Sequence, residues 1–88
     1  MVKISSLTDI VRTSSVVLYR EMYTATAVLS HNATLHEPKR VEFTIERRAL
    51  GPHHIHAAFL DDIDCPLAPA IAALSSHIGK LHQDGELP

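Results

Sequence analysis

A stretch of alternating side chains between positions 41 and 60 constrains this chain more than any other feature. Apolar and polar residues alternate on both sides of Gly51-Pro52, with Phe43 in the first half and Phe59 in the second. A period of two predicts strands with one buried face, and Gly-Pro predicts a turn. We therefore predict a β-hairpin that organises the fold.

The register of this hairpin follows from placing both phenylalanines on the buried face. Directly opposed residues share a face, so the loop must have an odd length. A loop at 50–52 pairs Glu46 with His56, and a loop at 51–53 pairs Arg48 with His56. We prefer the first register, because Glu46 would favour the charged imidazole and Arg48 would oppose it.

A helix is predicted over residues 67–84. Its apolar residues step by four, three, four and three positions: Leu67, Ile71, Leu74, Ile78 and Leu81. This spacing is typical of one buried helical face. We expect Asp64, or Asp62 if the helix starts earlier, to cap its beginning. Gly85 predicts a left-handed stop at its end.

The remaining segments are less regular. Residues 15–30 are rich in β-formers and predict a long strand, with a helix through Val17, Leu18 and Met22 as the alternative. Residues 1–14 predict a short helix or a disordered segment. Residues 31–40 contain Pro38 and several charges and predict a loop.

These segments predict a small α+β fold within a single domain covering residues 1–88. We expect a three-stranded antiparallel sheet followed by one C-terminal helix, in the order β-β-β-α. One helix leaves the second sheet face uncovered, and the first and third strands carry apolar residues on that side. Exposed apolar sheet faces usually mark interfaces. We therefore expect a homo-oligomer, in the simplest case a homodimer, formed through the sheet face or its edge.

Charge and hydropathy exclude some classes of partner. The chain has 8 basic and 10 acidic residues and a net charge of −2. A nucleic-acid-binding surface needs a basic stripe, so we expect no nucleic-acid partner. We expect no membrane partner either, because no stretch approaches the length of a membrane span. A single cysteine, Cys65, and no secretion signal favour a cytoplasmic location.

Histidine is unusually frequent, with 7 in 88 residues. His54 and His56 are two positions apart on one strand face, a spacing that offers two ligands to Zn²⁺, Ni²⁺ or Cu²⁺. His31, His36 or Glu46 are candidates for a third ligand. Exposed or interface histidines without a metal are the simpler interpretation, so a metal cofactor is an alternative hypothesis.

Three classes of function follow from these patterns. The first is a small non-enzymatic interaction or accessory protein, favoured because no catalytic motif is recognisable. The second is a histidine-rich metal-binding or metal-sensing protein. The third is a small-molecule binder or simple enzyme with a pocket at the subunit interface. The candidate binding residues are Tyr19, Tyr23, Glu46 and His56.

Overall fold

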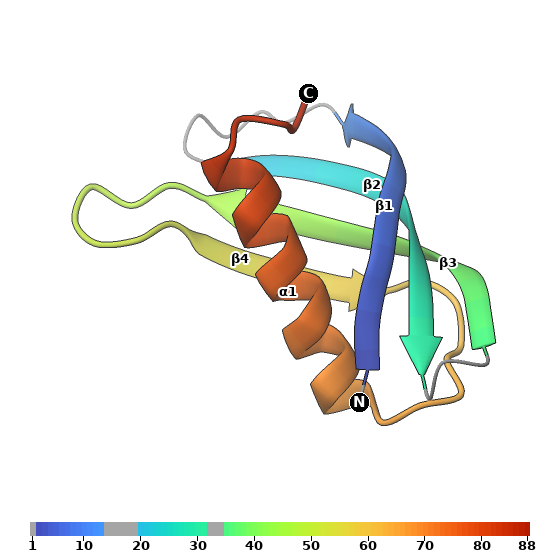
Figure 1. Ribbon diagram of the computed structural model, residues 1–88. Coiled ribbons are helices and arrows are strands. Elements are labelled where there is room, and N and C mark those ends of the chain that lie inside the picture. The colour runs from blue at the N-terminus through green and yellow to red at the C-terminus, as the bar shows by residue number, and fades with distance from the viewer. Residues whose placement is uncertain (1, 14–19, 32–34) are drawn as a thin grey trace.

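The computed structural model describes residues 2–13, 20–31 and 35–88. Its elements are β1 (Val2–Thr13), β2 (Arg20–His31), β3 (Leu35–Glu46), β4 (His54–Phe59) and α1 (Leu67–Gln83). The strands form one antiparallel sheet in the order β1-β2-β3-β4, followed by α1 (Figure 1). The predicted α+β class, an antiparallel sheet before one C-terminal helix, is confirmed. The sheet has four strands, however, and not three.

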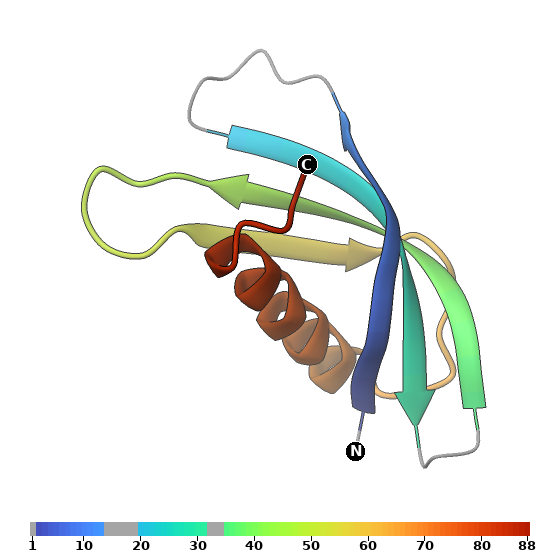
Figure 2. The same cartoon turned by 45° about the horizontal axis from the view of Figure 1, so that its top comes forward.

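The sheet is strongly curved, and α1 lies on its concave side (Figure 2). The backbone of α1 approaches the two edge strands, β1 and β4, most closely. The core therefore lies between α1 and the two central strands. A half-open sheet closed by a helix buries one face of each element and leaves the convex face of the sheet outward.

The concave face carries the predicted alternation. Every second residue of the central strands is buried, as is one stripe of α1. The buried core residues are Tyr23, Ala25, Ala27, Leu29, Val41, Phe43, Ile45, Ala70, Leu74 and Ile78. The prediction that Phe43 and Phe59 share a face is confirmed, since Phe43 is in this core and Phe59 packs against it.

The prediction of a short helix or disorder over residues 1–14 is wrong for the described residues, because 2–13 form β1. Its inward residues Ile4, Leu7 and Ile10 are three positions apart and mimic a helical repeat. Two irregularities in the pairing with β2, at 4–6 and 8–11, explain this spacing. Each adds unpaired residues, so the inward positions fall three apart and not two.

The predicted loop over residues 31–40 is also wrong where the structure describes it, because β3 begins at Leu35. Pro38 lies inside this strand, opposite Val28 of β2. On the other side of β3, β4 pairs only with residues 41–46. At Pro38, β3 is therefore an edge, where a residue without an N–H is tolerated. The predicted strand over 15–30 is found as β2, and residues 15–19 lie outside the described residues.

The observed hairpin register differs from both predicted ones by whole side-chain pairs. Thr44 lies opposite His56, and Glu46 lies opposite His54. Alternation decides only which face a residue occupies, so registers two residues apart satisfy it equally. The loop is longer than predicted, spanning 47–53. Its two ends are held by contacts of Arg47 with Glu21 and of His53 with His82.

The predicted helix is confirmed over Leu67–Gln83, but its predicted cap is wrong. Pro66 occupies the N-cap position, and no side chain caps the first turn. The end follows the prediction, since Gly85 has a φ of 71°. The amides of Gly85 and Glu86 donate to the carbonyls of His82 and Leu81, the pattern of a Schellman motif.

Candidate functional site

The candidate binding residues do not form one site. Tyr23 lies on the concave face, whereas His56 lies on the outward face, with Thr44 opposite it. The Tyr23 ring stacks on Phe43 with 4.8 Å between ring centroids. Tyr19 lies outside the described residues. Tyr23 is thus a core residue, and the grouping of tyrosine with His56 does not occur in the described structure.

Tyr23 belongs instead to a polar cluster that the sequence reasoning missed. Its hydroxyl donates to Glu21 Oε2 at 2.7 Å. Arg12 NH2 lies 3.1 Å from the same oxygen, and Arg47 pairs with Oε1. The hydrogen bond from Tyr23, with the two guanidiniums, lowers the pKa of Glu21 despite its partial burial. Burial, and then Glu21, raise the pKa of Tyr23.

This cluster joins β1, β2 and the 47–53 loop at one end of the sheet. Its carboxylate is matched by two guanidiniums and a hydroxyl, so the arrangement is that of a structural pin. A sequence signal for it exists. Glu21 shares its strand parity with Tyr23 and Ala25, which are buried. An acid at an inward position predicts a charged partner, because unpaired buried charges are costly.

The outward face of the sheet holds the histidine pair. The rings of His54 and His56 are 4.1 Å apart in an edge-on arrangement. Glu46 lies opposite His54 in the register and forms an ion pair with Arg20 at 3.3 Å. Within residues 2–13, 20–31 and 35–88, no group of three or more potential ligand side chains can hold a metal ion. The side chains of His31 and His36 are outside what is described.

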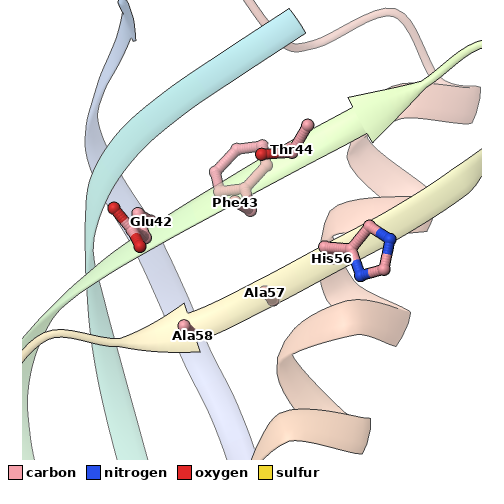
Figure 3. Close-up of a pocket in the computed structure, with 6 residues that line it drawn as sticks. All are labelled: Glu42, Phe43, Thr44, His56, Ala57 and Ala58. Atoms are coloured by element: carbon pink, nitrogen blue, oxygen red, sulfur yellow. The ribbon is translucent and has the colours of Figure 1, made fainter. Parts of the chain in front are cut away.

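A small hollow lies next to His56 on the outward face (Figure 3). Glu42, Thr44 and His56 stand around it, and Ala57 and Ala58 leave it open because their side chains are short. Its volume is about 110 Å³. Pockets for drug-sized ligands measure roughly 300–1,000 Å³. The hollow therefore suits a protruding side chain better than a small-molecule substrate.

The rest of the outward face is polar with a few apolar exceptions. Register places five threonines on it: Thr8, Thr13, Thr24, Thr26 and Thr44. Among the described residues of this face, the exposed large apolar side chains are Val11, Met22 and, just beyond β4, Leu60. The face is thus a polar surface with a local apolar ridge at Val11 and Met22.

Two larger depressions lie where α1 meets the edge strands. One, of about 400 Å³, lies at the β4–α1 connection and is lined by Phe59, Ile63, Leu67, Asp61 and the half-buried thiol of Cys65. Asp61 accepts a hydrogen bond from the amide of Arg40 at 2.8 Å, so part of this acidic segment caps the edge of β3. The other depression lies between β1 and α1 and measures about 360 Å³.

Comparison with known proteins adds a family. In the described parts of the chain, no helix is both long and apolar enough to cross a membrane. No curated protein and no solved structure matches the chain. The model of the BB-0187 family matches residues 1–83, nearly the whole chain, and the chain therefore belongs to that family.

Proposed function

We propose that the protein is a small non-enzymatic interaction domain that works as a homodimer formed through the outward face of its sheet. The observation that carries this proposal is an apolar ridge and a hollow on the same face. Met22 is 42% exposed and Val11 is 56% exposed, although both belong to regular strands. Exposed apolar groups of this kind favour a protein contact.

The ridge and the hollow are close enough to be exchanged between two copies. Met22 of β2 lies opposite Thr44 of β3, and Thr44 lies opposite His56 of β4. The ridge and the hollow therefore occupy the same row of the sheet, separated by one strand. A two-fold axis above that strand places Met22 of each copy against the hollow of the other.

The charges of the face also suit a copy of itself. Arg40 and Glu42 are exposed neighbours on the outward side of β3. A two-fold axis between them sets each arginine against the glutamate of the partner. Opposite charges then meet and like charges stay apart, which favours this pairing over random association.

The edges of the sheet are less suited to pairing. The irregularities of β1 break its ladder of backbone groups, and bulged edges resist the addition of another strand. The other edge, β4, has only six residues. These features favour contact through the face over contact through an edge.

Sedimentation at low micromolar concentration tests the proposal. The unmodified chain is expected to be a dimer, and Met22→Lys is expected to be a monomer with an unchanged far-ultraviolet circular dichroism spectrum. Leu50→Lys is the matched control, because Leu50 is an exposed apolar residue of the 47–53 loop and lies off the face. A monomeric unmodified chain, or a dimer that survives Met22→Lys, would contradict the proposal.

A further inference from the structure

The depression between β1 and α1 has a basic rim. Val2, Ile4 and Ala73 form its apolar part, and Lys3, His77 and Lys80 line it with Ser76. No acidic side chain is among its described lining residues. Lys3 and Lys80 are exposed, and they come from opposite walls, one from the strand and one from the helix. An occupant of this groove would therefore meet positive charge on both sides.

The strand wall of the groove is an edge with hydrogen-bonding capacity. Residues 2–4 pair with β2 on one side, and no described strand lies on their other side. They precede the first irregularity of β1, so their ladder is regular. Backbone groups on such an edge can receive an extended segment, which then packs against the neighbouring helix.

We propose that this groove binds an extended acidic segment of another protein, added as a short strand beside Val2–Ile4. Alternate residues of the segment would face the apolar part of the groove. The residues between them would carry carboxylates toward Lys3 and Lys80. This partner site goes beyond the proposed dimer, because it uses the β1–α1 groove and leaves the ridge and the hollow free.

The groove favours an acidic protein segment over other anions. Lys3 and Lys80 are compact charges separated by an apolar floor, and no arginine fork is present among the described lining residues to grip a phosphate. An extended peptide offers both the apolar side chains and the backbone groups that the floor and the edge require.

An amide NMR titration of the full chain tests this proposal. The probe is an acetylated peptide of alternating glutamate and valine, and the opposite-charge probe replaces each glutamate with lysine. The glutamate peptide is expected to cause saturable shifts at residues 2–4 and 73–80, with a Kd between about 0.1 and 1 mM. Added salt is expected to weaken this binding.

Charge reversal supplies the matched variants. Lys3→Glu combined with Lys80→Glu is expected to weaken binding by about tenfold or more. Arg48→Glu changes charge in the distant 47–53 loop and is expected to leave the Kd unchanged within about twofold. Three results would each overturn the proposal: no saturable shift up to about 2 mM peptide, equal binding of the lysine peptide, or shifts confined to other residues.

Discussion

The hydroxyl of Tyr23 stabilises the fold through Glu21, and Tyr23→Phe removes that hydroxyl while keeping the ring that stacks on Phe43. The lost bond is 2.7 Å long and joins a 2% exposed tyrosine to a carboxylate whose side chain is 17% exposed. Hydrogen bonds to charged groups contribute about 1.5–3 kcal/mol. Because Arg12 and Arg47 still pair with Glu21, we expect a loss near the lower end, about 1.5 kcal/mol.

Urea unfolding followed by circular dichroism measures this loss. For a domain of this size the dependence of the unfolding free energy on urea is about 1 kcal/mol per molar, so the midpoint should fall by about 1.5 M. Glu21→Gln and the double variant complete a cycle that isolates the energy of the Tyr23–Glu21 pair from other effects of each change.

The effect of Tyr23→Phe should depend on pH. The pKa of Glu21 is lower in the folded chain than its ordinary value of 4.5, chiefly because of the hydrogen bond from Tyr23. The carboxylate therefore stabilises the fold fully above that ordinary value, and the stabilisation is lost as the pH falls through the lower folded pKa. The difference between the two proteins should shrink accordingly.

Two results would refute this reasoning. One is a difference in unfolding free energy below about 0.3 kcal/mol at neutral pH, since a bond to a charged group should exceed that value. The other is a difference that is the same at about pH 3 as at neutral pH, because the contribution of Glu21 must decline once it is protonated.

Three further substitutions test the core, the helix and the bulge by urea unfolding. Leu74→Ala is expected to lower the unfolding free energy by about 2–5 kcal/mol, because Leu74 is fully buried beneath the sheet; a loss under about 1 kcal/mol would contradict its place in the core. Gly79→Ala is expected to raise it by about 0.5–1 kcal/mol, since the added Cβ would sit at an ordinary contact distance of 3.5 Å from Ile55 Cδ1; destabilisation would show that the helix needs a closer approach there. Asp9→Val is expected to lower it by about 1 kcal/mol or more, with Asp9→Asn near neutral, because Asp9 has a φ of 52° that a β-branched residue tolerates poorly; equal stability of the two variants would contradict strain at this position.

The candidate sites show why sequence patterns located chemistry less well than structure. The pair His54 and His56 was recognisable, because a spacing of two puts both on one strand face, and their rings do meet. The partner of Glu46 was not, since Arg20 reaches it from a neighbouring strand. The Glu21 cluster joins residues up to 26 positions apart, and no local pattern reports such contacts.

The sequence by itself determined the hairpin, its odd parity and the C-terminal helix. These depend on the periodicity of side chains and on local backbone preferences, such as that of Gly85 for a positive φ. Tertiary structure decided the fourth strand, the hairpin register and the role of Tyr23. β1 carries a helix-like spacing that becomes a strand only because its bulges fit it to β2. The register depends on which long-range contacts hold the ends of the loop, namely Arg47 with Glu21 and His53 with His82. Periodicity assigns a residue to a face, but the residues that lie across from it are chosen by the packing of the whole chain.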